Sequence, residues 1–366
     1  MKKNFYDVND AGKVFFWAVL TPQILSVAVA IFMILTGSLL GLTYIEMYEL
    51  YFDLFILTML AQVAFFLVYV KCNKNIEFKK ASKINKLSLK NLLLCILIGV
   101  IGVFALNPIS NCLYSLFETI GLRGAAVMPF EPAGAFTYIT AVLLFALVPA
   151  VVEELIFRGV ILHGFRKFGF WQAIIFSSIL FALIHANIQQ FAYTFIFGAV
   201  LAYLVLKTGS LLASMIIHFI ANFASITFYN FNIFAFEFEM NVVYWLVAIV
   251  LLVLFVLMVY YLGKRMKSDD KTIDKQRIYE ELAKIEVRGE NGEEMPKEKK
   301  VSYIINCYKK GQVLDCKANV EEVKKLSQLL SSLDLNEEQK NDNRYLLRFG
   351  IMLSIIIFIM QTLLIV

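Results

Sequence analysis

The chain has 366 residues, of which 60% are hydrophobic and only 17% are charged. Soluble globular domains are about half apolar and about one-quarter charged, so this composition excludes a soluble globular protein and indicates a chain folded in a bilayer. The formal net charge of +5 is small, and basic residues between apolar spans report membrane topology, so nucleic-acid binding is not expected.

Apolar runs of about 20 residues, the length that crosses the hydrocarbon core as a helix, recur along the chain. They predict an all-α fold, a helical membrane bundle of about nine transmembrane helices. The first run is too long for the apolar core of a cleavable signal peptide, which favours a retained helix. The predicted spans are 14–42, 50–70, 91–117, 137–166, 171–187, 190–206, 210–230, 241–262 and 346–366.

The segment between the second and third spans is strongly basic. Residues 71–90 contain a series of lysines and the single acid Glu77. Because basic loops stay on the cytoplasmic side, this segment is expected in the cytoplasm. Following the predicted spans in both directions from this segment predicts a multi-pass protein of the cell membrane, with its N-terminus in the cytoplasm and its C-terminus outside.

Composition divides the chain into five predicted parts. Residues 1–136 hold the first three spans, residues 137–230 hold the next four, and residues 231–263 hold the eighth. Residues 264–345 are polar and mixed in charge with helical periodicity, which predicts a small cytoplasmic helical segment. Residues 346–366 form the predicted C-terminal span.

The fourth span contains three charged residues, Glu153, Glu154 and Arg158. Each charge in a membrane helix costs about 2.5–3.5 kcal/mol to insert, so such residues are functional candidates. Glu154 and Arg158 are four residues apart, which puts them on one helix face where they can pair. Glu153 points about 100° away and is left to face another partner.

Further polar candidates lie in the fifth and seventh spans. His185 ends the fifth, and His218 and Asn222 share one face of the seventh. Counted from the predicted turns of two helical hairpins, Glu153 and His185 lie about 23 Å from the cytoplasmic end. His218 lies about 14 Å and Asn222 about 20 Å from that end. The four groups are therefore expected at similar depth, in one site that opens towards the cytoplasm.

These residue types suit the hydrolysis of a peptide bond. A carboxylate beside an imidazole can hold a water molecule and take its proton. A second imidazole and an amide can donate hydrogen bonds to the oxyanion of a tetrahedral intermediate. The expected catalytic residues are Glu153, His185, His218 and Asn222, supported by Glu154 and Arg158.

The three motifs also resemble a known signature in order and spacing, that of the CAAX protease and bacteriocin-processing family, also called Abi proteins. The motifs are Glu153-Glu154-xxx-Arg158, Phe181-xxx-His185 and His218-xxx-Asn222. The resemblance covers residues 137–230 and implies an intramembrane endopeptidase similar to CAAX prenyl endopeptidases. It implies a membrane-associated protein or peptide as substrate, within the lipid bilayer.

The resemblance also implies roles for the individual residues. Glu153 and His185 would activate the attacking water, and His218 and Asn222 would stabilise the oxyanion. No cofactor is expected on this reading. Glu153, His185 and His218 also form a plausible set of three zinc ligands, so zinc is the alternative cofactor.

Two other classes of function stay open. The chain can be read as a transporter whose intramembrane acids line an ion path, although its polar residues gather at one depth. It can also be read as a non-proteolytic bacteriocin-immunity or scaffold membrane protein that retains the motifs. Of the remaining residues, Gly198 and Ala202 fit close helix packing, and His163 is expected at the membrane interface.

Overall fold

The computed structural model describes residues 6–36, 41–74, 82–122, 134–185, 187–233 and 242–266, with isolated positions at 76, 78, 303–304, 350–352 and 354–356. Within these residues the chain is helical and has no β-strand, which confirms the predicted all-α class. Apart from residues 264–266 and the isolated positions, the predicted cytoplasmic segment 264–345 and the predicted span 346–366 lie outside the described residues.

Seven helices of the described ranges are long and apolar enough to cross a bilayer, and they correspond to seven of the predicted spans. The chain is therefore a multi-pass membrane protein. The fifth predicted span is a shorter apolar helix, α9 (Phe170–Leu183), whose 14 residues rise by about 21 Å. That length falls short of a hydrocarbon core about 30 Å thick.

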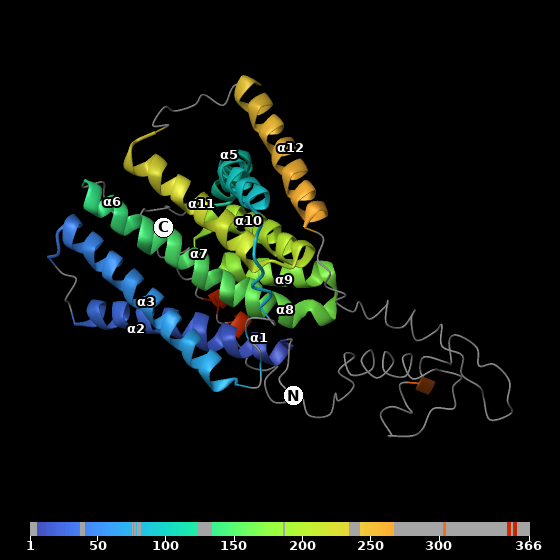
Figure 1. Cartoon of the computed structure of the whole chain (residues 1–366). Coiled ribbons are helices and arrows are strands. Elements are labelled where there is room, and N and C mark those ends of the chain that lie inside the picture. The colour runs from blue at the N-terminus through green and yellow to red at the C-terminus, as the bar shows by residue number, and fades with distance from the viewer. Residues whose placement is uncertain are drawn as a thin grey trace, which may run out of the picture. The chain divides into compact units, whose positions relative to one another are not determined.

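The crossing helices are labelled in Figure 1. The first consists of α1 (Val8–Val14), the π-helical segment η1 (Phe15–Leu20) and α2 (Thr21–Leu35), and is followed by α3 (Tyr44–Cys72) and α5 (Leu89–Thr119). The fourth consists of α6 (Ala135–Ala141), the π-helical segment η2 (Val142–Leu147), α7 (Val148–Glu153), the π-helical segment η3 (Glu154–Ile161), α8 (Leu162–Phe165) and the 3₁₀ turn η4 (Arg166–Phe168). After α9 come α10 (Ile188–Thr208), α11 (Leu211–Asn230) and α12 (Val242–Arg265).

Capping residues set the starts of two helices. The Asp7 side chain accepts hydrogen bonds from the backbone N–H groups of Asn9 and Asp10, and the Asp10 side chain accepts from the Asp7 N–H. This capping box starts the first helix at Val8, six residues before the predicted start at residue 14, because it satisfies N–H groups that the first turn leaves unpaired. Thr43 and Glu46 form the same arrangement at the start of α3.

Two glycines make the turns that bring the motif-bearing helices together. Gly169 lies between η4 and α9 with φ 122°, and Gly209 ends α10 in the left-handed conformation with φ 62°. Residues with a side chain rarely adopt such backbone angles. The fifth predicted span ends earlier than residue 187, because Asn187 is instead the N-cap of α10 and accepts from the Gln189 N–H.

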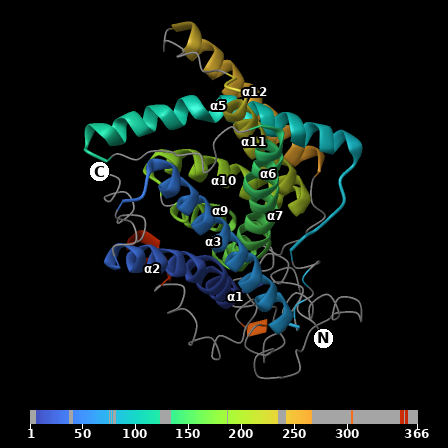
Figure 2. The ribbon, with the colours of Figure 1, turned by 90° about the vertical axis from the view of Figure 1, so that its left-hand side faces the viewer.

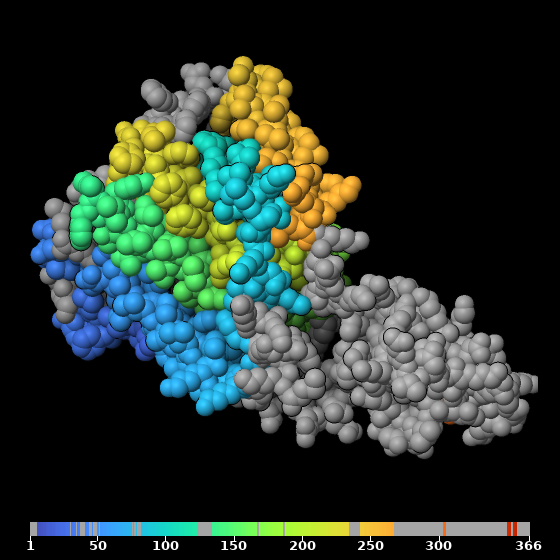
Figure 3. All heavy atoms as spheres, viewed as in Figure 1, coloured from blue at the N-terminus to red at the C-terminus, as the bar shows by residue number. Residues whose placement is uncertain are grey.

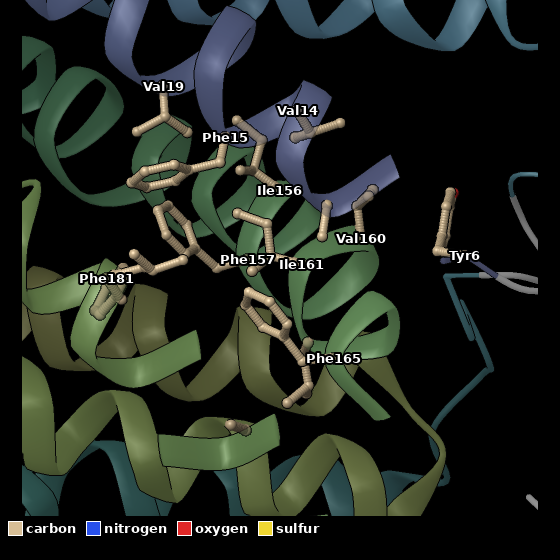
Figure 4. Close-up of a cluster of buried hydrophobic side chains, with 14 of the residues drawn as sticks. Tyr6, Val14, Phe15, Val19, Ile156, Phe157, Val160, Ile161, Phe165 and Phe181 are labelled. Carbon is tan, nitrogen blue, oxygen red and sulfur yellow. The ribbon is translucent and has the colours of Figure 1, made fainter. Parts of the chain in front are cut away.

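The first helix packs against the part of the fourth that carries the acidic motif. Figure 4 shows Val14, Phe15 and Val19 facing the side chains of Ile156 and its neighbours on η3. Phe15 and Ile156 are completely buried in this cluster. In Figures 1 and 2 α1 lies beside the α8 end of the fourth crossing, and the first helix contacts η3 and α8, which it therefore covers on one side.

A second cluster of buried apolar residues joins α5, α10, α11 and α12. The space-filling view in Figure 3 shows α5 lying between α11 and α12 on this face. Gly99 on α5 permits the approach to α11, because a Cβ atom there would lie 2.7 Å from Cβ of Ile220. The first cluster thus holds the acidic motif and the second holds α11, which carries the last motif.

Candidate active site

Glu154, Arg158 and His218 form one buried polar cluster. Arg158 Nη1 lies 2.8 Å from Glu154 Oε1, and both side chains are 0% exposed. His218 Nδ1, on α11, donates a hydrogen bond of 3.0 Å to the same Glu154 oxygen. A buried charge without a partner is strongly destabilising, so this ion pair and hydrogen bond together allow Glu154 to be buried. The cluster fixes η3 and α11 to each other.

The Arg158 guanidinium has two further contacts that the sequence did not predict. Its Cζ atom lies 4.1 Å from the centre of the Phe181 ring, and Nη2 donates to the Gly198 carbonyl at 3.2 Å. A Cβ atom at Gly198 would lie 3.2 Å from Nη2 and 3.1 Å from Cδ1 of Phe181. The missing side chain of Gly198 therefore makes room for Arg158 as well as for close helix packing. The contact with its backbone carbonyl could not be predicted from the sequence.

Glu153 faces the other nitrogen of the same histidine. Its side chain is 17% exposed, and its Oε2 lies 3.9 Å from His218 Nε2. That separation is longer than a direct hydrogen bond. In the described part of the chain, His218 has a ring nitrogen within 4.0 Å of the Glu153 carboxylate. His218 thus lies between two carboxylates, one buried and one partly accessible.

His185 lies directly after α9 in a turn. Its Nδ1 donates to the Phe181 carbonyl at 2.8 Å, and its ring packs edge-on against the Phe181 ring with centroids 4.9 Å apart. Because a carbonyl can only accept, Nδ1 carries the proton and the neutral ring presents a lone pair at Nε2.

Asn222 lies one helical turn beyond His218 on α11. Its Nδ2 donates to the Phe145 carbonyl, in η2, at 3.3 Å. Pro149 is four residues after Phe145 and has no N–H, so it cannot supply the hydrogen bond that an α-helix would give to that carbonyl. Asn222 uses one N–H of its amide in this contact and keeps the second available for another acceptor.

His163 is packed inside the protein. It is 9% exposed, and its Nδ1 donates to the Arg158 carbonyl at 2.7 Å; its predicted place at the membrane interface stays a prediction. The five-residue separation suits the wider π-helical turn of η3. π-Helical turns are rare and occur often at functional sites, and the sequence pattern gave no indication of one here.

The site contains acidic and imidazole groups that could also suggest a metal centre. In the described ranges, no group of three or more His, Cys, Asp or Glu side chains has the geometry to hold a metal ion. Glu153, His185 and His218 therefore do not form a ready set of ligands in this conformation.

Part of the chain matches a known family. Residues 135–224 match the family described as Type II CAAX prenyl endopeptidase Rce1-like. The matched segment contains all six predicted site residues and confirms the resemblance inferred from the three motifs. No curated protein and no solved structure matches the chain.

Proposed function

We propose that this chain, which belongs to the CAAX protease family over residues 135–224, is an intramembrane endopeptidase. Its substrate would be a membrane-associated protein or peptide that reaches the site from the cytoplasmic side. The observation that carries the proposal is the buried Glu154–Arg158 pair, which holds His218 with its second nitrogen towards Glu153. A purely structural ion pair would not need the partly exposed second glutamate.

Glu153 is the proposed general base. It takes a proton from a water molecule while the water oxygen attacks the carbonyl carbon of the scissile peptide bond. The lone pair at His185 Nε2 accepts the second hydrogen of that water and so orients it. The C–N bond then breaks, and the proton on Glu153 passes to the leaving amine.

Asn222 and His218 are the proposed oxyanion donors. The second N–H of Asn222 can donate in any protonation state of the site, whereas His218 already uses its Nδ1 proton on Glu154. His218 can therefore donate from Nε2 only as an imidazolium, with a proton on both nitrogens. Asn222 can therefore always donate to the oxyanion, whereas His218 can do so only when both of its ring nitrogens carry a proton. Glu154 and Arg158 support His218 and touch no reacting atom.

The test is peptidase activity of the detergent-purified protein on a pooled peptide library. Glu153→Gln is expected to abolish cleavage, since the amide cannot take the proton and general bases contribute about 10²–10⁴-fold. Wild-type cleavage that persists with a strong chelator supports the metal-free mechanism. Cleavage lost on chelation and restored by zinc would move Glu153, His185 and His218 to ligand roles.

Three other outcomes would count against the proposal. Equal cleavage by wild type and Glu153→Gln would exclude Glu153 as the base. No cleavage of any library peptide, or of membrane-anchored peptides added in vesicles, would favour a non-proteolytic immunity or scaffold protein. A proton or cation flux that depends on Glu153 would favour a transporter.

A further inference from the structure

A hydrogen bond links the first helix to the turn that carries His185. Gln23 lies in α2, partly buried, and its Nε2 donates to the Ile184 carbonyl at 2.8 Å. The two residues are 161 positions apart in sequence. Gln23 lies outside the family-matched segment 135–224, whereas Ile184 directly precedes His185 within it.

The Ile184 carbonyl is one of the carbonyl groups at the end of α9 that have no hydrogen-bond partner within the helix. The last four carbonyls of a helix have no partner within it, and α9 ends at Leu183. Other hydrogen bonds of this turn are local, from the Ile184 N–H to Leu180 and the His185 N–H to Ala182, each at 3.3 Å, and from His185 Nδ1 to Phe181. Gln23 thus supplies a tie from this turn to a distant helix.

The same first helix also packs on the helix that carries the glutamates. Phe15 and Val19 of η1 are buried with Ile156 of η3 (Figure 4). One continuous helical segment therefore contacts both η3, which begins at Glu154 directly after Glu153, and the turn with His185. Its position sets the separation between the carboxylates and that imidazole.

We propose that Gln23 is a positioning residue for His185. The amide holds the Ile184 carbonyl, and with it the backbone that fixes where His185 Nε2 points. Small misplacements of a reacting group can lower a rate by about 100-fold, so loss of this hydrogen bond acts on the chemical step. The proposal rests on the proposed peptidase function, since it assigns a role to a residue acting through His185.

Two substitutions of Gln23 separate a positioning role from simple packing. Gln23→Met keeps the length and removes the donor, and kcat is expected to fall about tenfold with KM little changed. Gln23→Glu can donate to the carbonyl only when the new carboxyl is protonated. Its activity relative to wild type is therefore expected to rise as the pH falls, while that of Gln23→Met stays flat.

Taking the ratio to wild type at each pH removes the pH dependence that wild type and variants share. Thr21→Val is the matched control, because the Thr21 hydroxyl also donates from α2, but locally, to the Phe16 carbonyl at 3.1 Å. It is expected to leave kcat near the wild-type value. The thermal midpoint of each variant in detergent identifies any that fails to fold.

The outcomes distinguish this inference from the proposed function. An inactive wild-type chain would contradict the peptidase proposal itself. An active wild type with unchanged kcat in folded Gln23→Met would overturn the positioning role alone. If the activity of Gln23→Glu relative to wild type does not change with pH and its Tm is low, Gln23 has only a packing role.

Discussion

Glu153 and Glu154 are neighbours in sequence with opposite surroundings. The Glu154 side chain is completely buried and bound by Arg158 and His218, whereas the Glu153 side chain is 17% exposed and faces His218 across 3.9 Å. The two glutamates therefore have different roles although their side chains are identical. Glu154 fixes the arginine and the histidine, and Glu153 keeps a carboxylate free for the reaction proposed here.

This division predicts different effects of the same isosteric change at the two positions. Glu154→Gln is expected to lower the stability by about 3–5 kcal/mol, because Arg158 stays buried without a counter-charge. Glu153→Gln, the matched control, is expected to keep a Tm near wild type while losing activity. The measurement is the thermal midpoint in detergent.

A double variant makes this prediction sharper. Adding Arg158→Met to Glu154→Gln removes both buried charges, so part of the lost stability is expected to return. If Glu154→Gln has the Tm of Glu153→Gln, or if the double variant is the less stable one, the buried pair does not account for the role of Glu154.

At the scale of elements, the fourth crossing is broken into short segments at the place where it meets α11. η2 ends at Leu147, Pro149 follows in α7, and η3 begins at Glu154. The Phe145 carbonyl accepts a hydrogen bond from Asn222, while the Phe145 ring packs against Phe55 of α3 with centroids 4.9 Å apart. The irregular helix thus supplies a fixed acceptor that orients the Asn222 amide.

Pro149→Ala is expected to weaken that orientation. The new N–H can claim the Phe145 carbonyl and compete with Asn222, so kcat is expected to fall several-fold while the Tm stays equal or rises. The check is a cycle with Asn222→Ala, measured as kcat/KM. Pro149→Ala should have no further effect in the Asn222→Ala background, and equal effects in both backgrounds would contradict the coupling.

For the whole molecule, apolar length predicted the crossings well, since the bilayer imposes it directly. The start of the first helix was missed because the Asp7 capping box is a local polar signal outside the apolar run. The length of α9 was overestimated because Asn187 begins the next helix. The predicted five-part division of the chain stays a prediction.

Sequence spacing predicted candidate residues but not the contacts among them. Helical spacing gave the Glu154–Arg158 pair, which depends on one helix alone. It could not give the bond between His218 and Glu154, because periodicity defines a face and not its partner. A single amide such as Gln23 in an apolar span carries no pattern that would separate it from its neighbours.

The predicted orientation can be measured on α3, whose ends are marked by Glu46 and the exposed Cys72. A chain with Cys72 as its single cysteine is expected to react with a membrane-impermeant maleimide only after cells are opened. Glu46→Cys, in a background without other cysteines, is expected to react on intact cells. The reverse pattern would place the lysine-rich segment 71–90 outside.

The packing of the first helix against η3, together with the Gln23 bond, limits how the family segment can be exchanged between proteins. A chimera that receives residues 135–224 alone would pair the foreign Ile156 surface and Ile184 carbonyl with a first helix shaped for another partner. In this protein the first helix and residues 135–224 therefore form one packed unit, although no motif marks α2. Hybrids that receive the first helix together with residues 135–224 are expected to be active more often than hybrids that receive residues 135–224 alone.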